Sequence, residues 1–240
     1  MVRIPQRVHF IGIGGAGMSS LSRILLEKGI QVSGSDIKRT GVTEELARLG
    51  ATVYYGHSPE NLKNAELVVV STAIPRDNVE VVAARECGIP VIHRSEMLAH
   101  LMSLQQGIAV AGAHGKTTTT SLIALLLEKA GFDPTVVIGG EARHLGSGAR
   151  AGKGAYLVAE ADESDGSFLR LSPRIAVVTN VEADHLDYYG TFENVCQTFY
   201  RFLCRLPADG LAVLCIDDPF LATVAHQLTV PVCTYGENPC

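Results

Sequence analysis

The sequence predicts an α/β protein with a Rossmann-like parallel-sheet domain, followed by a P-loop NTPase-like α/β domain that we expect to be truncated. Two glycine-rich loops, and the regular alternation of strand-like apolar runs with helical stretches, carry this prediction. The first loop begins at Gly12 and the second at Gly112, each between a short apolar run and a helical pattern. Strand, loop and helix in this order bind phosphate groups, so two loops imply two phosphorylated ligands, one in each domain.

Length and composition limit the class of protein. The chain has 240 residues, of which 47% are hydrophobic and 19% are charged, as is typical of a globular protein with a buried core. The formal net charge of −5 gives no basic excess and weighs against nucleic acid as a partner. No apolar run approaches the roughly 20 residues of a membrane helix, so no membrane insertion is expected. The six cysteines form no C-x-x-C pair, which favours reduced thiols in a cytoplasmic protein.

The first glycine loop is a full G-x-G-x-x-G. Residues 8–11 predict a strand, the loop covers 12–17, and 18–29 has the pattern of a helix. The next predicted strand, 31–35, ends at Asp36, at the distance where a Rossmann unit places its ribose-binding acid. Taken alone, this half favours a bound dinucleotide, and a purely structural tight turn is the alternative.

The alternation of elements continues to residue 104. Predicted helices at 43–49, 79–87 and 97–104 alternate with predicted strands at 52–55, 67–70 and 91–92. Ligands of such sheets lie at the carboxyl ends of the strands, so four residues that follow strands are expected beside the first glycine loop: Ser71, Thr72, Ala73 and Arg94. Arg94 is suited to charge-assisted hydrogen bonds with a diphosphate, whereas His57 and His93 could equally be structural.

A polar, glycine-ended break at 103–107 marks the predicted domain boundary. We expect residues 1–104 to form the first domain and residues 105–240 the second. In the second domain, the sequence predicts helices at 191–206 and 219–227 and strands at 210–216 and 230–233.

The second glycine loop follows the apolar run 107–110 and precedes a helical pattern over 121–129. Gly112 and Gly115 allow backbone N–H groups to face a phosphate, Lys116 can reach terminal phosphate oxygens, and the Thr117 hydroxyl can bind Mg²⁺. The loop is a shortened nucleoside triphosphate motif, because the strict G-x-x-x-x-G-K-[ST] pattern requires glycine where Val110 stands. The alternative is a glycine-containing turn with an incidental lysine.

Two strand ends in the second domain carry candidate metal ligands. The predicted strand 155–159 is followed by Glu160, a typical position for a carboxylate that holds Mg²⁺ beside a triphosphate loop. The acids that come next, at 162–165, are interpreted as a solvated turn. His185 follows the predicted strand 174–180 and is flanked by acids that could fix its tautomer, although an isolated histidine is more often structural.

Four segments together resemble the Mur ligases of peptidoglycan synthesis: 9–19, 111–119, 160–165 and 179–185. The resemblance spans essentially the whole chain, and the shortened triphosphate loop is the form that this family uses. The opening G-x-G-G-x-G-M favours the member that joins L-alanine to UDP-N-acetylmuramate over relatives that add later residues of the peptide stem. The resemblance thus implies a cytoplasmic ligase of cell-wall biogenesis, cell shape and cell division.

The resemblance implies that the first domain holds the UDP of a sugar substrate rather than a nicotinamide dinucleotide. The residues expected to bind this substrate are Gly12, Gly14, Gly15, Ala16, Gly17, Met18, Asp36, His57, Ser71, Thr72, Ala73 and Arg94. The residues expected to bind ATP are Gly112, Ala113, His114, Gly115, Lys116, Thr117 and Thr118. Catalytic roles are expected for Lys116, Glu160 and His185, and Mg²⁺ is expected on Thr117, Glu160 and His185.

The implied reaction forms an amide through an acyl phosphate made from ATP and the carboxylate of UDP-N-acetylmuramate. No lysine follows Lys153, so the carbamylated lysine that some members use as a magnesium ligand is not expected here. The remainder of the family's ATP domain and its amino-acid-binding domain are also not expected, and the chain is predicted to be inactive alone. Two alternatives stay open: a nicotinamide-dependent oxidoreductase, which leaves Lys116 unused, and a catalytically silent nucleotide-binding module.

Overall fold

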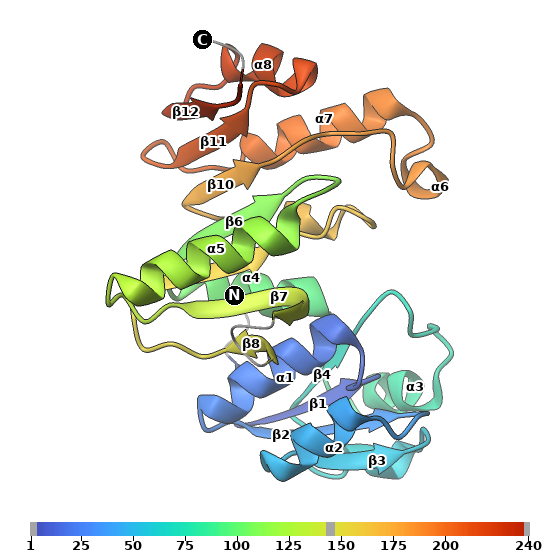
Figure 1. Cartoon of the computed structure of the whole chain (residues 1–240). Helices are drawn as coiled ribbons and strands as arrows, with labels where there is room; N and C mark the ends of the chain where they lie inside the picture. Colours follow the sequence, from blue (N-terminus) through green and yellow to red (C-terminus); the bar gives the residue numbers. More distant parts are fainter. Residues whose placement is uncertain (1–3, 143–146, 238–240) are drawn as a thin grey trace. The chain divides into compact units, whose positions relative to one another are not determined.

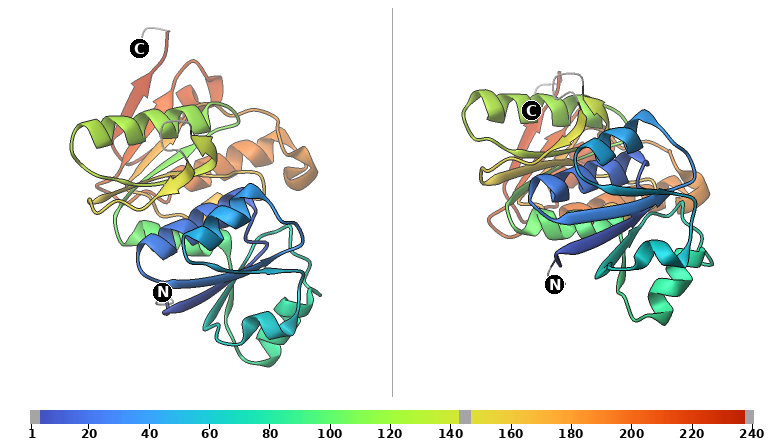
Figure 2. Two further views of the ribbon diagram at one scale, coloured as in Figure 1. Left: turned by 60° about the horizontal axis from the view of Figure 1, so that its bottom comes forward. Right: turned by 90° about the horizontal axis from the view of Figure 1, so that it is seen from below.

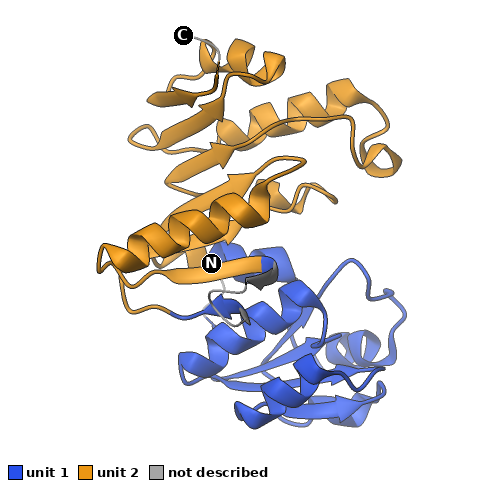
Figure 3. Cartoon of the chain, viewed as in Figure 1, with its two compact units in different colours: residues 1–100, 139–151 blue, residues 101–138, 152–240 orange. Residues whose placement is uncertain are grey.

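A computed structural model describes residues 4–142 and 147–237 (Figure 1). The chain forms two compact units (Figure 3). The first unit runs to His100 and includes Gly139–Ala151, and the second contains Leu101–Ile138 and the chain from Gly152 onward. Each unit is built on a sheet of parallel-paired strands flanked by helices, which confirms the predicted α/β class.

The first unit contains a five-stranded parallel sheet in the order β3-β2-β1-β4-β5. Its strands are β1 (Arg7–Ile11), β2 (Gln31–Asp36), β3 (Thr52–Tyr55), β4 (Leu67–Val70) and β5 (Val91–His93). Its helices are α1 (Ala16–Glu27), α2 (Gly41–Arg48), the 3₁₀ turn η1 (Pro59–Leu62), α3 (Val79–Glu86) and α4 (Arg94–Ser103), which continues into the second unit. The strand order reverses between β1 and β4, and ligands bind at such switch points. The first glycine loop follows β1.

The second sheet has seven strands in the order β12-β11-β10-β6-β9-β7-β8. Its strands are β6 (Gln106–Ala111), β7 (Thr135–Ala142), β8 (Ser147–Arg150), β9 (Tyr156–Glu160), β10 (Ile175–Val178), β11 (Leu211–Cys215) and β12 (Val232–Tyr235). Its helices are α5 (Lys116–Lys129), the 3₁₀ turn η2 (Ser167–Arg170), α6 (Leu186–Tyr189), α7 (Phe192–Leu203) and α8 (Pro219–Ala225). Helices α5 and α7 lie on opposite faces of the sheet (Figure 2). Among the described residues, none of the helices has the length and apolarity to span a bilayer.

After residue 105, the structure differs from the sequence expectation at α5, β7 and β8. Helix α5 begins at Lys116 rather than near residue 121, because the loop geometry overrides the weak helix propensity of four successive threonines. Strands β7 and β8 were not predicted. The β-branched run that opens β7 passes into glycines, which weaken the strand pattern. β8 is short, and in the first unit it packs against α1, where Glu27 accepts a 2.6 Å hydrogen bond from the Ala151 N–H.

An aromatic cluster anchors the chain after β9. Phe168 in η2 packs on two rings of α7, at centroid distances of 5.3 Å from Phe199 and 4.8 Å from Phe202. All three side chains are almost completely buried, and burial of each contributes about 1.5–3 kcal/mol. The cluster therefore fixes the segment between β9 and η2 that carries the acids of residues 160–165.

A buried polar network connects the strands of the first unit. The fully buried Glu80 carboxylate, in the first turn of α3, accepts hydrogen bonds from Ser35 of β2 and, at 2.6 Å, from Asn61 of η1. His57 Nδ1 lies 3.0 Å from Glu80 Oε2, and His9 Nε2 of β1 lies 3.8 Å from Oε1. Burial raises the pKa of Glu80, but His9, Ser35 and Asn61 together outweigh it and hold the pKa at about 2. The charged carboxylate thus connects α3 with β1, β2 and η1.

This network predicts a specific acid sensitivity. The pKa of Glu80 is lower in the folded chain than in the unfolded one, so its contribution to stability is present near neutral pH. That contribution is lost as the pH falls from about 5 through about 2 and amounts to roughly 3 kcal/mol. In urea unfolding at a series of pH values, Glu80→Gln should remove this part of the pH dependence. Glu60→Gln, at an exposed residue of η1, is the matched control. The prediction would be contradicted if the free energy of unfolding changed with pH in the same way in wild type and in Glu80→Gln.

Candidate functional site

The first glycine loop is tied to the end of β2. Gly12 has a φ of +80°, and its N–H donates to the Ser35 carbonyl at 2.8 Å. The Gly14 N–H donates to Asp36 Oδ2 at 2.9 Å, and a Cβ at Gly14 would lie only 2.9 Å from that oxygen. Asp36 therefore lies directly against the loop, and the close approach requires glycine at position 14.

Other expected residues of the first unit lie at the same edge. A Cβ at Gly17 would come within 2.9 Å of Arg94 Nη1, so this guanidinium reaches the first turn of α1. The turn after β4, which contains the expected Ser71, Thr72 and Ala73, brings the Ile74 side chain within 3.1 Å of a Cβ built on Gly12. Among the remaining candidates, Gly15 caps α1, Ala16 and Met18 belong to its first turn, and His57 joins the Glu80 network.

The two helices that follow glycine loops begin differently from α2, α3, α7 and α8. Side chains cap the N-termini of α2, α3, α7 and α8: Thr40, Asn78, Thr191 and Asp218. Helices α1 and α5 instead have glycine at the N-cap, Gly15 and Gly115, with no side-chain cap and no acid in the first turn. Their first N–H groups and the positive end of each helix dipole therefore remain available to an anion.

The second loop is shaped by glycine and by the end of β10. Gly112 has a φ of +138° and Gly115 a φ of +82°. A Cβ at Gly112 would lie 2.1 Å from Thr179 Oγ1, so the position excludes any side chain. Thr179 Oγ1 donates to the His114 carbonyl at 2.6 Å, and the His114 N–H donates to Asn180 Oδ1 at 2.8 Å. The sequence predicts no contact of these two residues with the loop, although their position at a strand end is a signal for one.

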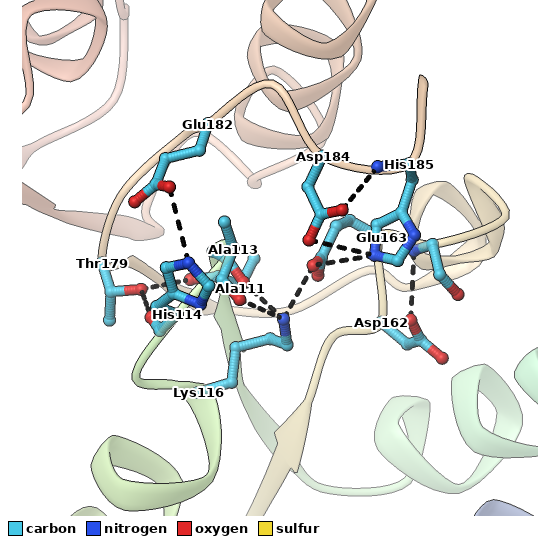
Figure 4. A network of polar contacts seen from close by, with 12 residues as sticks. Ala111, Ala113, His114, Lys116, Asp162, Glu163, Thr179, Glu182, Asp184 and His185 are labelled. Carbon is cyan, nitrogen blue, oxygen red and sulfur yellow. Dashed lines mark hydrogen bonds and ion pairs between the residues drawn. The ribbon is translucent and has the colours of Figure 1, made fainter. Parts of the chain in front are cut away.

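Lys116 is enclosed by polar partners at the mouth of this loop. Its Nζ donates to the Gly112 carbonyl, to the Ala113 carbonyl at 3.2 Å and to Glu163 Oε1 at 2.7 Å (Figure 4). Its side chain is 19% exposed, so the ammonium group lies at the surface of the loop rather than in bulk water. Thr117 and Thr118 follow in the first turn of α5 and are exposed.

The interpretation of the acids at 162–165 as a solvated turn is wrong for Glu163. This residue is only 3% exposed, and the aromatic anchor of η2 explains why the segment packs inward. Burial raises the pKa of the Glu163 carboxyl above its ordinary value, although the bond from Lys116 acts in the opposite direction. Its backbone carbonyl accepts hydrogen bonds from the Tyr189 hydroxyl and the Gly166 N–H.

His185, at the N-cap of α6 in the segment that follows β10, faces the same carboxylate. Its Nε2 lies 3.9 Å from Glu163 Oε1 and 3.8 Å from Asp184 Oδ2 (Figure 4). Its backbone has a φ of +54°, an uncommon conformation for a residue other than glycine. Residues in this region are often functional, because the surrounding structure must hold them there. Lys116, Glu163 and His185 thus form one polar cluster.

The donor set beside the loop suits a magnesium ion. Glu160 ends β9 and pairs in register with Val110, just before the loop, and Thr117 lies in the first turn of α5. Glu163 Oε2 is buried without a hydrogen-bond partner in the described part of the chain. No group of three or more His, Cys, Asp or Glu side chains is arranged as a metal site within that part. Mg²⁺ needs none, because it binds through one or two carboxylates together with phosphate oxygens and water.

Comparison with known proteins places this geometry in a family. Residues 7–106 match the Mur ligase family, catalytic domain, and residues 110–239 match the Mur ligase middle domain. The chain is 57% identical over 235 residues to a protein of Pelotomaculum thermopropionicum named UDP-N-acetylmuramate–L-alanine ligase, covering 98% of this chain and 51% of that relative. The chain thus spans about half the length of the curated relatives it matches.

Two solved structures have the same fold with a TM-score of 0.86 and 31% identity. One is UDP-N-acetylmuramate-alanine ligase MurC from Thermotoga maritima, of which the chain covers 53% while 97% of the chain is matched. The other is the UDP-N-acetylmuramate:L-alanyl-gamma-D-glutamyl-meso-diaminopimelate ligase from Neisseria meningitides, with coverage of 95% of this chain and 77% of that one. The family models and these likenesses confirm the resemblance found in the sequence, and the chain belongs to the Mur ligase family.

Proposed function

We propose that this chain contributes the sugar-nucleotide and ATP sites of a ligase that joins L-alanine to UDP-N-acetylmuramate in peptidoglycan synthesis. The observation that carries the proposal is the presence of two uncapped, glycine-started helices in two separate units, with a lysine in the second loop only. The relatives named for this reaction, at more than half identity over nearly the whole chain, support the choice of substrates.

In the first unit, the N-terminus of α1 and the Arg94 guanidinium would bind the UDP diphosphate. Both groups lie at the first turn of α1, where backbone N–H groups and a cation together neutralise two phosphates. Asp36 and His57, with Ser71–Ala73, would contact the nucleoside or the sugar, because they follow strands at the same edge of the sheet.

In the second unit, the loop N–H groups and Lys116 would bind the ATP phosphates. Thr117, Glu160 and His185 would hold Mg²⁺, which, when bound, draws charge from the phosphate oxygens. The reacting groups are both anionic, so neutralisation and alignment are the main tasks of these residues. Thr179 and Asn180 would keep the loop in shape through their bonds to His114.

The proposed reaction has two balanced steps. A carboxylate oxygen of UDP-N-acetylmuramate attacks the γ-phosphorus of ATP, the bond to the bridging oxygen breaks, and ADP leaves. The amine nitrogen of L-alanine then attacks the carbonyl carbon of the acyl phosphate, inorganic phosphate leaves, and the nitrogen loses a proton. Lys116 serves the first step by stabilising negative charge on the transferred phosphoryl group.

Calorimetric titration of the 240-residue chain with UDP-N-acetylmuramate, NAD and NADP tests the first site. We expect binding of the UDP-sugar alone. We also expect Gly14→Val to weaken it at least tenfold, because the added side chain meets Asp36 and Thr43 where the loop must approach the diphosphate. Binding of NAD or NADP without the UDP-sugar would support an oxidoreductase and exclude the ligase.

Lys116→Ala, in the longer protein that also contains the remaining half of the relatives' length, tests the second site. The variant should lose at least a hundredfold of the phosphate release that depends on ATP, UDP-N-acetylmuramate and L-alanine, because a charge on the transferred phosphoryl group is no longer stabilised. Its affinity for the UDP-sugar should remain that of the wild type. Retained turnover would refute the role of Lys116, and a wild-type protein without turnover would favour a silent nucleotide-binding module.

A further inference from the structure

Lys116 has no unused hydrogen-bond donor in this structure. An ammonium group carries three N–H donors, and its three partners here are the carbonyls of Gly112 and Ala113 and the Glu163 carboxylate. A phosphate can therefore contact Lys116 only if one of these bonds is replaced.

Glu163 is the partner that a phosphate would replace. The two carbonyls belong to the loop itself, whereas Glu163 comes from the segment after β9 and carries a negative charge, as a phosphate does. The backbone of Glu163 is fixed, because its carbonyl accepts from the Tyr189 hydroxyl and from the Gly166 N–H at 3.0 Å. The carboxylate is therefore expected to remain beside the loop after Lys116 has turned to a phosphate.

A carboxylate left in this position would need another cation. Glu163 is 3% exposed, so water gives it little solvation. Its Oε2 is buried without a hydrogen-bond partner in the described part of the chain, and its Oε1 faces His185 Nε2 at 3.9 Å. Placing a polyphosphate next to this charge without a compensating cation is costly, because the repulsion acts in a poorly solvated region.

We propose that Glu163 is a positioning residue that makes nucleotide binding depend on a divalent cation. In the nucleotide-free protein it holds Lys116 at the mouth of the loop. When a terminal phosphate takes Lys116, the carboxylate opposes a metal-free nucleotide and favours a metal-bound one. This role rests on the proposed ATP site and adds to it the selection of MgATP over free ATP.

The test compares the binding of ATP with excess Mg²⁺ and with EDTA, in the longer protein that also contains the remaining half of the relatives' length. In the wild type, Mg²⁺ should strengthen binding. The measured quantity is the dissociation constant in EDTA divided by the dissociation constant in Mg²⁺. In Glu163→Gln and Glu163→Ala this ratio should fall about tenfold, mainly because metal-free ATP binds more tightly once the repulsion is removed. Glu163→Asp keeps the charge and should keep most of the wild-type ratio. Glu193→Gln, at an exposed residue of α7, is the matched control and should leave the ratio unchanged.

The outcomes separate this inference from the proposed function. An unchanged ratio in both uncharged variants, or an equal loss of affinity with and without Mg²⁺, would overturn the role of Glu163 and leave the ATP site in place. A wild-type longer protein that binds no ATP under either condition would overturn the ATP site itself. Thermal unfolding followed by circular dichroism shows whether each variant is folded, and the two uncharged variants give two independent chances of a folded protein.

Discussion

The parallel register of β6 with its two neighbours determines the second site. Val110 pairs with Glu160 of β9, and Ala111 pairs with Val178 of β10. Because parallel strands end at the same edge of a sheet, this register brings the triphosphate loop, the acids after β9 and the polar residues after β10 together. Segments separated by about 50–70 residues in the chain thus meet around one lysine.

The two buried carboxylates show how local partners decide the state of a charge. Glu80 is fully buried, yet its partners His9, Ser35 and Asn61 hold its pKa at about 2. The pKa of Glu163 is raised, because burial outweighs the bond from Lys116. The first carboxylate is satisfied within its own unit and stabilises the fold. The Glu163 carboxylate has one oxygen without a partner among the described residues, and it lies beside a loop that can bind anions, so we assign its remaining interactions to a ligand.

Helix capping distinguishes the two helix ends that follow glycine loops from the N-termini of α2, α3, α7 and α8. In these four helices, a threonine, asparagine or aspartate side chain at the N-cap accepts a hydrogen bond from a backbone N–H of the first turn. Each such cap contributes about 1 kcal/mol. Helices α1 and α5 have no such cap, and each follows a glycine loop. The backbone N–H groups at these two helix ends therefore have no side-chain acceptor at the N-cap. A bound phosphate would accept hydrogen bonds from them.

The sequence by itself determined the α/β class, both glycine loops, most strands and helices, and the family, because these depend on local periodicity and on short motifs with fixed spacing. Tertiary structure decided what local patterns do not contain. Strand β8 finds its place by packing on α1, and α5 starts at Lys116 because the loop sets its first turn. Glu163 looked like part of a solvated turn, but the aromatic anchor of η2 and the register of β9 turn it inward onto Lys116. The burial of a side chain and the choice of its partners arise only when distant segments pack together. The sequence therefore did not reveal that the Glu163 carboxylate is buried and bonded to Lys116.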